Sequence, residues 1–423
     1  MVEKPYDWSN GAVLVDHSRA KHTILRQYIF DYLKVRCAIP QQTRFRIAIV
    51  DGFAGAGRYG DGSPGSPLIF VEELRRASEA INLKRSIDGL GPVEISCLLL
   101  LNDLDPKAVE MLRAAIQPLL AGVTAEVPLL TIETRFFNEA FEDAYPEIRD
   151  ILLKGRLRNV LFNLDQCGHS HVRNATLQDI MASFRGAEIF YTIMIESLIS
   201  FLHKRDPDRL IKQLAPFGLD GADVERLLPM MGRKEWLGTG ERMVFETFRT
   251  CAPYVSPFSI NNPAGWRCWL IHFANSYRAR QVYNDVLHDN ANMQAHFGRS
   301  GLEMLSYDPE KGGELYLFDD KGRKSAHGQL VDDIPRLILE TGDAMQVEEF
   351  YENFYNLTPA HADDIHRAMI DSADIEILTP SGGQRRRPNA ISGGDIIKVK
   401  PQRTFFQFFG APRDKGGPSS TGK

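Results

Sequence analysis

The stretch Phe45–Leu68, FRIAIVDGFAGAGRYGDGSPGSPL, decides the fold. Its first part, Ile47–Val50, is a short apolar run that ends at Asp51, and a turn rich in glycine follows. This pattern predicts a buried parallel strand that leads into a glycine turn. Glycines let the backbone take positive φ angles and approach a ligand closely, and the next helix offers unpaired N–H groups. The stretch therefore predicts a binding site for a nucleotide-like cofactor.

Two cofactors fit a turn of this kind. Three of its glycines match the pattern G-x-G-x-x-G, but in a dinucleotide site the helix opens within that motif and an acid follows about 20 residues later. Here the glycines and prolines of residues 61–67 exclude a helix before about Ser66, and the acid that ends the next strand, Asp103, comes much later. An acid after each of the first two strands and a glycine turn between them fit S-adenosylmethionine better.

Composition limits the classes of protein that the chain can belong to. Its 423 residues are more than a single hydrophobic core usually holds, so we expect an α/β domain with a second, smaller domain. With 43% hydrophobic and 25% charged residues it resembles an ordinary soluble protein, and its net charge of -5 excludes a globally basic nucleic-acid binder but not a local basic patch. Five scattered cysteines argue against zinc and disulfides. We expect a cytoplasmic protein without a membrane span or a metal.

Alternation of strands and helices predicts the architecture of the first 300 residues. After the glycine turn we expect a helix at 67–80, and then a strand at 95–102, a helix at 106–120, and strands at 128–134, 160–165 and 187–197. This order predicts a doubly wound parallel sheet, whose ligands lie beyond the carboxyl ends of the strands. That edge would gather Asp51, Asp103, Asn138 and Asp165.

A helix is also predicted before the first strand, from Lys21 to Lys34, because apolar residues recur there at helical spacing. Lys21 and His22 open this helix. Cations at a helix amino terminus oppose the helix dipole, which suggests that they are held there for a ligand carboxylate, although two solvated polar residues would give the same pattern.

The remaining chain divides into further segments. Residues 201–251 read as a helical insertion, residues 254–277 as a hairpin that closes the sheet, and residues 278–292 as a helix. The domain at 1–300 is then followed by a linker at 301–324, a unit at 325–409 and a disordered tail at 410–423.

The unit at 325–409 has three helices followed by two strands with a basic loop, which is the order of a winged helix. The loop carries Arg385, Arg386 and Arg387, which we expect to contact nucleic-acid phosphates. The third helix is rich in aspartate, which is unsuited to reading a major groove, so a winged helix that binds protein remains an alternative.

Longer motifs carry a resemblance to the three-Cys-motif partner (TcmP) proteins: KHTILRQYI, VDGFAGAGRYGDGSPGSPL, NDLDP, FNLDQCGHSHV and GWRCWLIHFANSYRARQVYNDVL. The first half is also similar to the adenine-N6 methyltransferases of ribosomal RNA, through KHT, AGAGRY and P-G-S-P-L. The resemblance implies a Rossmann-like class I methyltransferase sheet and a three-Cys-motif protein as partner. It implies that S-adenosylmethionine is bound by Lys21, His22, Asp51, Gly55, Gly57, Asp103 and Asn138.

The sequence departs from the related enzymes where the acceptor is bound. Amino methyltransferases carry Asp/Asn-Pro-Pro-aromatic after the fourth strand, so that two oxygens accept the hydrogens of the amine and the ring stacks on the base. This chain has Asp165-Gln-Cys-Gly168. Asp165 and His169 are the catalytic candidates, with His169 or His171 supplying a ring or a base. Cys167 fits a thiolate nucleophile, or more simply a small buried side chain.

Three classes of function follow from these residues. The first is an S-adenosylmethionine-dependent methyltransferase acting on DNA or RNA, in which an adenine amino group is one acceptor. The second is a non-catalytic cofactor- and nucleic-acid-binding partner of a three-Cys-motif protein in a mobile-element or defence system. The third, a nuclease, is weakest because the carboxylates show no metal-ligand spacing.

Overall fold

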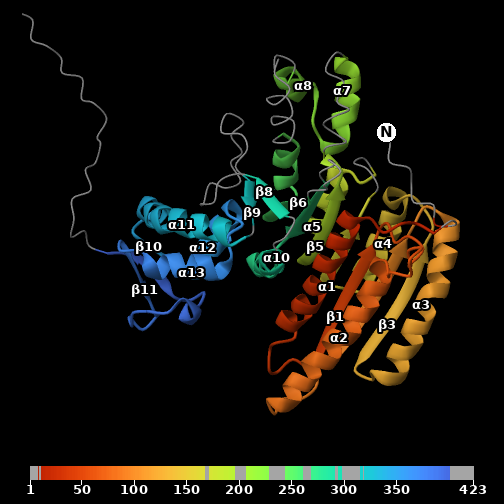
Figure 1. Cartoon of the computed structure of the whole chain (residues 1–423), viewed down its shortest axis with the longest axis horizontal. Coiled ribbons are helices and arrows are strands. Elements are labelled where there is room, and N and C mark those ends of the chain that lie inside the picture. Colours follow the sequence, from red (N-terminus) through yellow and green to blue (C-terminus); the bar gives the residue numbers. More distant parts are fainter. Residues whose placement is uncertain are drawn as a thin grey trace, which may run out of the picture.

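The computed structural model describes residues 8, 11–166, 171–195, 206–227, 243–260, 268–290, 294–297, 315–317 and 319–400. In this part of the chain nine strands form one sheet, in the order β3-β2-β1-β4-β5-β7-β6-β8-β9 (Figure 1). The first five strands pair in parallel. They are β1 (Arg44–Asp51), β2 (Glu94–Asn102), β3 (Leu130–Phe137), β4 (Asn159–Leu164) and β5 (Gly186–Ile193). The predicted parallel sheet is therefore confirmed.

The predicted hairpin consists of β6 (Tyr254–Ile260) and β7 (Cys268–Ala274). It adds to the sheet through β7, which pairs antiparallel with both β5 and β6. Two short strands, β8 (Gln294–Phe297) and β9 (Leu315–Leu317), extend the sheet beyond β6. The last of these lies in the segment that the sequence assigned to a linker, so the sheet takes in residues beyond position 300.

Helices cover both faces of this sheet (Figure 1). On one face lie α1 (Asp16–Arg36), α2 (Ser66–Ile87), α3 (Pro106–Glu126) and α10 (Tyr277–Asp289), and on the other α4 (Phe141–Lys154) and α5 (Asn174–Ser183). The sequence of β1 is continuously apolar because both of its faces are buried. Ile47 and Ile49 pack in the core on the α1 side, while Ala48 and Val50 pack in the core on the α4 and α5 side. A strand buried on both faces has no polar side to present.

The predicted insertion is helical where it is described. It contains α7 (Pro207–Leu214), the 3-10 turn η2 (Ala215–Phe217), α8 (Gly221–Leu227) and a helical stretch at 243–249. Figure 1 shows α7 and α8 projecting from the top of the sheet. Apolar side chains from this segment, including Leu210, Phe217 and Phe248, join the core on the α4 and α5 side. The insertion is therefore anchored in the sheet domain by its apolar face.

The C-terminal unit has the predicted order of helices and strands. Its elements are α11 (Asp320–Thr341), β10 (Ala344–Gln346), α12 (Val347–Phe354), η5 (Tyr355–Leu357), α13 (Ala362–Asp371), β11 (Ile375–Leu378), η6 (Pro388–Ala390) and β12 (Ile396–Val399). The three strands pair in the order β10-β12-β11. The sequence missed β10, which has only three residues and is too short to show a period.

The first helix of this unit begins earlier than position 325. The carboxylate of Asp319 accepts a hydrogen bond of 2.7 Å from the backbone N–H of Gly322, which caps α11 at its amino end. The predicted tail at 410–423 lies outside the described residues.

Candidate functional site

The glycine turn lies at the topological switch point of the sheet. There the strand order reverses, because β1 has β2 on one side and β4 on the other. The turn is tied to both neighbours: the Gly52 N–H donates to the Asn163 carbonyl at 2.9 Å, and the Ala54 N–H donates to the Asn102 carbonyl at 2.8 Å. Gly57 has a φ of 83°, and a Cβ at this position would lie 2.9 Å from a methyl carbon of Leu112. Backbone conformation and packing together require glycine there.

Asp51 ends β1 and is completely buried. Its carboxylate accepts hydrogen bonds from the Ser66 hydroxyl at 2.6 Å, the Asn163 amide at 3.2 Å and the Phe53 N–H at 3.3 Å. Burial raises the pKa of Asp51 to about 7, although these three donors favour the ionised form. Asp51 thus links the glycine turn to α2 and β4 through hydrogen bonds.

Asp51→Asn should change how stability depends on pH. A carboxyl whose folded pKa is raised keeps, between about pH 4 and pH 7, a proton that the unfolded chain has lost. Its contribution to stability is complete below the unfolded pKa and is lost as pH rises through about 7. Urea denaturation across this range should therefore show the wild type losing stability relative to Asp51→Asn as pH rises. A constant difference between the two proteins would contradict the raised pKa.

Asp103 follows β2 and faces the glycine turn. It accepts the Gly55 N–H at 2.8 Å and the Asp105 N–H at 2.9 Å, and burial raises its pKa although both bonds lower it. Asn138, at the end of β3, donates its amide hydrogens to the carbonyls of Asp103 (2.9 Å) and Leu104 (3.1 Å). Asn138 therefore fixes the backbone of the loop that carries Asp103.

Lys21 and His22 lie within α1 and not at its start. The helix begins at Asp16, so the prediction that these two residues open it is wrong, and the argument from the helix dipole fails with it. Burial lowers the pKa of His22 to about 4, so this side chain is neutral at pH 7. Lys21 is also buried, and its ammonium group contacts the Asp165 carboxylate at 2.5 Å.

Asp165 and Gln166 follow β4 and are both engaged. Burial would raise the pKa of Asp165, but the adjacent Lys21 ammonium holds it below its usual range, so the carboxylate is ionised at neutral pH. The Gln166 side chain donates to the Tyr191 hydroxyl at 2.7 Å and accepts the His171 N–H at 2.9 Å. The side-chain carbonyl of Gln166 is thus already used within the protein, which the sequence did not show.

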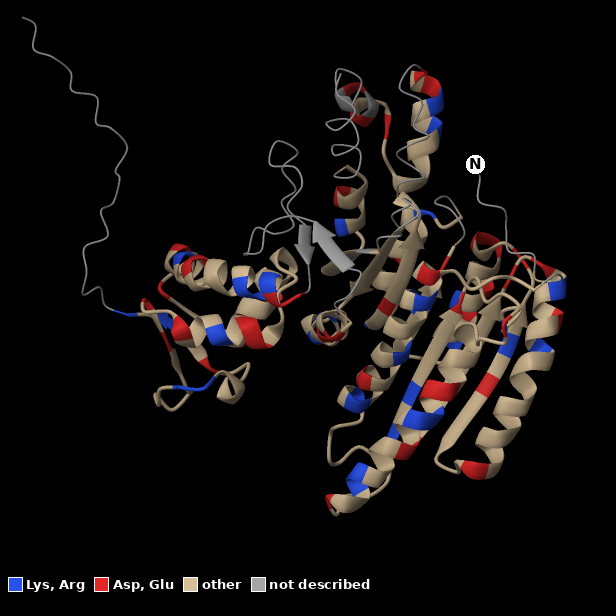
Figure 2. Ribbon diagram, viewed as in Figure 1, with Lys and Arg blue, Asp and Glu red and all other residues tan. Residues whose placement is uncertain are grey.

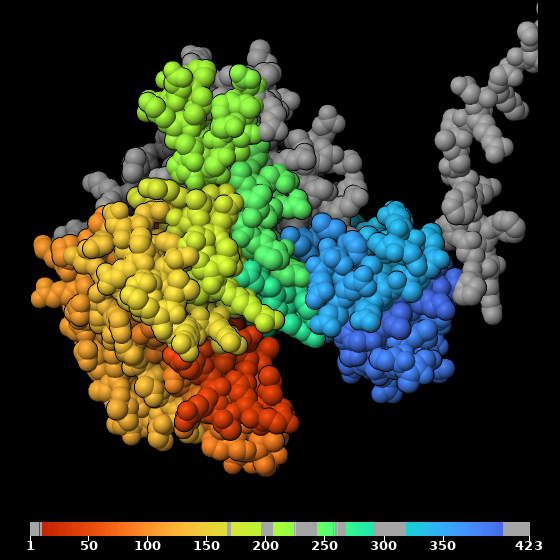
Figure 3. Space-filling model, turned by 180° about the vertical axis from the view of Figure 1, so that it is seen from behind, coloured from red at the N-terminus to blue at the C-terminus, as the bar shows by residue number. Residues whose placement is uncertain are grey.

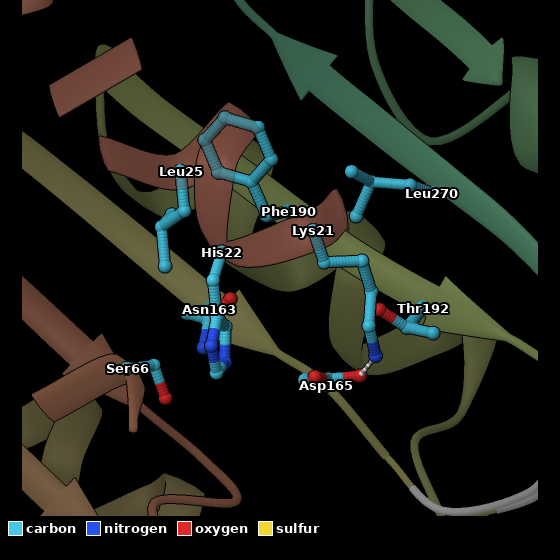
Figure 4. A pocket seen from close by; sticks show the side chains of 9 residues that line it. All are labelled: Lys21, His22, Leu25, Ser66, Asn163, Asp165, Phe190, Thr192 and Leu270. Atoms are coloured by element: carbon cyan, nitrogen blue, oxygen red, sulfur yellow. Dashed lines mark hydrogen bonds and ion pairs between the residues drawn. The ribbon is translucent and has the colours of Figure 1, made fainter. Parts of the chain in front are cut away.

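A pocket lies between these groups, at the carboxyl edge of β4 and β5 (Figure 4). It encloses about 310 Å³, part of which is open to solvent. One wall is polar and the other is apolar, with Lys21 and Asp165 joined at its lower side in Figure 4. Its lining consists of Lys21, His22, Leu25, Ser66, Asn163, Asp165, Phe190, Thr192 and Leu270. Three of the predicted site residues therefore meet in one cavity.

Some residues of this site were not singled out in the sequence. Asn163 is a buried polar residue inside an apolar strand, which was the available signal for it. Trp8 had no such signal, yet its ring lies so close to Gly55 that a Cβ there would collide with the indole. Trp8 also packs against Tyr59, whose ring in turn contacts His22, at centroid distances of 5.5 and 5.8 Å. Aromatic rings therefore cover the glycine turn on the side of α1.

Two of the proposed catalytic residues, His169 and Cys167, lie outside the described residues. His171 is described: it is exposed, and its ring lies 6.4 Å from that of Phe53. The structure thus places Lys21, His22 and Asp165 around one pocket, and Asp103 beside Gly55 of the glycine turn with Asn138 bonded to its backbone. The roles of all these residues, and those of His169 and Cys167, stay predictions.

The three arginines of the wing loop differ in their surroundings. Arg385 makes a two-pronged ion pair with the buried Asp395, with N–O distances of 2.9 and 3.1 Å. Arg386 and Arg387 are exposed. The ion pair uses the guanidinium of Arg385 to hold the loop together, so Arg386 and Arg387 are the two of the three arginines that lack this structural role. The phosphate contacts of the loop stay a prediction.

Two other features are absent from the described residues. No group of three or more His, Cys, Asp or Glu side chains there is placed to hold a metal ion. No helix in the same ranges is long and apolar enough to span a bilayer.

Comparison with known proteins bears on the C-terminal unit. A search of curated proteins finds no match to this chain. A family model described as "GMT-like wHTH domain" matches residues 306–382, which include α11, β10, α12, α13 and β11. The C-terminal unit is therefore similar to a winged helix-turn-helix domain of this type, in agreement with its fold.

Proposed function

We propose that this protein is an S-adenosylmethionine-dependent methyltransferase that acts on nucleic acid. The observation that carries the proposal is the arrangement at the carboxyl edge of the sheet: the glycine turn after β1 with Asp103 beside it, and the pocket at β4 and β5 that contains Lys21 and Asp165. The order β3-β2-β1-β4-β5 of the parallel strands is also that of a doubly wound Rossmann-like sheet, which the sequence resemblance to methyltransferases implies. This likeness supports the fold and not the chemistry.

The residues present fit the cofactor. Asp103 places a carboxylate beside the backbone of Gly55, where it can accept hydrogen bonds from two ribose hydroxyls. Lys21 supplies a buried cation for a carboxylate, while the neutral His22 offers a ring nitrogen. The buried Asp51 would hold the turn in place for the cofactor through its hydrogen bond with Ser66. When bound, S-adenosylmethionine supplies a methyl group activated by a sulfonium.

The chain's contribution at the acceptor side is positioning. The ionised Asp165 can accept a hydrogen bond from an exocyclic amine and orient its lone pair, because the carboxylate lines the pocket. Leu25, Phe190 and Leu270 form the apolar wall and limit the access of water. An adenine amino group is the acceptor that the sequence resemblance favours, and the winged helix would hold the surrounding DNA or RNA.

One observation favours a second candidate, a binding protein without catalysis that partners a three-Cys-motif protein. Lys21 occupies one oxygen of Asp165, and the side chain of Gln166 is bonded to Tyr191 and His171. An exocyclic amine can reach that oxygen of Asp165 only if Lys21 turns away, and the Gln166 side-chain oxygen is shared with the His171 N–H. Binding of cofactor and nucleic acid with no methyl transfer to either DNA or RNA would select this second function.

Asp103→Ala should weaken S-adenosylmethionine binding at least tenfold. Loss of hydrogen bonds to a charged acceptor costs about 1.5–3 kcal/mol each, and 1.4 kcal/mol corresponds to a factor of ten. Isothermal titration calorimetry measures the change directly. Asp105→Ala is the matched control, because Asp105 caps α3 through the Lys107 N–H and is not assigned to the ligand. Equal affinity of Asp103→Ala and wild type would remove the cofactor assignment.

A further inference from the structure

A second charged surface lies at the amino edge of the sheet, at the other end of the strands from the pocket. We call five exposed residues there the amino-edge arginines: Arg36, Arg46, Arg156, Arg158 and Arg185. They come from four parts of the chain, namely the end of α1, the start of β1, the loop from α4 to β4, and the loop from α5 to β5. None of them lines the pocket or belongs to the wing loop.

Hydrogen bonds between their segments place these arginines next to one another. The Arg36 guanidinium donates to the Asn159 side chain, whose amide donates to the Arg46 carbonyl at 2.9 Å. The Gly186 N–H donates to the Arg158 carbonyl at 3.0 Å. Because β1, β4 and β5 are neighbours spaced by about 4.8 Å, residues at their starts fall within roughly 10 Å of one another.

The charge of this surface is not cancelled locally. Other cations at the same edge are paired with acids: Lys34 with Asp31, Arg44 with Glu94, and Lys154 with Asp150. By contrast, within the described ranges no carboxylate lies within ion-pair distance of Arg46, Arg156, Arg158 or Arg185. A local surplus of positive charge in a chain of net charge -5 marks a surface for a polyanion.

The winged helix supplies the reason to expect nucleic acid at this surface. The exposed charges of α13 are mainly acidic, with Asp363 and Asp371 against Arg367, so this helix repels phosphates. A nucleic acid held by the wing arginines therefore needs cations from elsewhere in the molecule. Figure 3 shows α1 (red) and the C-terminal unit (blue) on the two sides of an open notch. Figure 2 shows basic segments at the lower end of α1 and in the wing.

We propose that the amino-edge arginines bind the phosphate backbone of a nucleic acid. Arginine suits this role because its planar guanidinium forms paired hydrogen bonds with phosphate oxygens. Contacts of this kind carry no sequence information, so the surface adds affinity and orientation. The inference rests on the nucleic-acid part of the proposed function and is independent of methyl transfer.

The test compares three variants with wild type, using fluorescence anisotropy of a labelled single-stranded RNA and a duplex DNA at several salt concentrations. Arg156→Gln/Arg158→Gln/Arg185→Gln should lower the salt slope of binding by roughly two to three, because each phosphate that an arginine neutralises contributes about 0.7–0.9 to the slope. Arg386→Ala/Arg387→Ala should lower it by about 1.4–1.8 on the same basis. Lys107→Gln/Arg113→Gln/Arg135→Gln is the control, with an equal change in charge on α3 and β3, and should keep the wild-type slope.

Two outcomes would overturn the inference. In the first, the amino-edge triple variant keeps the wild-type salt slope of binding, or its slope decreases no more than that of the control variant. The other is wild-type protein that binds neither nucleic acid but binds a labelled polyglutamate through the same three arginines, which would assign the surface to an acidic protein. Calorimetry with S-adenosylmethionine separates this inference from the proposed function, because the triple variant should bind the cofactor as wild type does.

Discussion

Asp165→Ala should lower the rate of the proposed methyl transfer by about 10²- to 10⁴-fold, roughly 3–5 kcal/mol. Asp165 is the carboxylate at the end of β4 that both lines the pocket and stays ionised at neutral pH, since Lys21 holds its pKa down. The carboxylate therefore acts as an acceptor across the neutral range and cannot be replaced by the Gln166 side chain, which is bonded elsewhere. Single-turnover rates with saturating cofactor and nucleic acid measure the decrease.

Measuring cofactor binding distinguishes a specific loss of methyl transfer from a general structural defect of the site. Asp165→Ala should bind S-adenosylmethionine within a fewfold of wild type, because the ribose contact is assigned to Asp103. Lys21→Met tests the ion pair from the other side: it should weaken cofactor binding if the ammonium serves the cofactor carboxylate. If Cys167→Ala abolishes transfer while Asp165→Ala does not, the thiolate mechanism replaces the one proposed here.

The second large effect concerns stability and arises from Arg280 in α10. Its guanidinium is fully buried, and no described carboxylate pairs with it. Instead it donates to the carbonyls of Val255 at 3.0 Å and Thr358 at 2.9 Å, and to the side chains of Ser256 and Asn356 at 2.5 and 3.2 Å. Burial lowers its pKa to about 10. One side chain thus joins β6 to η5 and to Thr358, the residue that follows η5.

Arg280→Met should lower the free energy of unfolding by about 3–5 kcal/mol. Methionine fills part of the volume but leaves several buried oxygens without a donor, and each such oxygen costs about 1–3 kcal/mol before relaxation. Urea denaturation measures the change. Arg278→Met is the matched control, because Arg278 lies on the same helix but is exposed and should change stability by less than about 0.5 kcal/mol. Equal stability of the two variants would show that the Arg280 contacts contribute nothing net.

The Arg280 hydrogen bonds also bear on how the C-terminal unit is attached. Apolar residues of this unit, such as Leu330, Phe350 and Ile365, belong to one core cluster that also contains residues of α1 and α10. The rings of Tyr277 in α10 and Tyr351 in α12 stack at 5.5 Å. The unit is therefore docked on the sheet domain through a packed and hydrogen-bonded interface.

The local sequence by itself determined the five parallel strands and their alternation with helices. Continuous apolar runs such as Ile47–Val50 signal burial on both faces, and the glycine turn with Asp51 and Asp103 marks the carboxyl edge where ligands bind. These features are readable because strand burial, turn geometry and helix capping depend on neighbours in sequence. Prediction from the sequence fails at short elements such as β10, which show no period, and at helix starts such as Asp16, where a capping signal is lacking.

Only the tertiary structure decided how the charged residues are used. Lys21 lies 144 positions from Asp165 in the chain, yet their ion pair sets the charge state of the pocket. Arg385 looked equivalent to Arg386 and Arg387 until the buried Asp395 proved to be its partner. The amino-edge arginines became one surface only when β1, β4 and β5 were placed side by side. Charge acts through space and depends on burial, so its role follows from the packing of distant segments and cannot be read from local sequence.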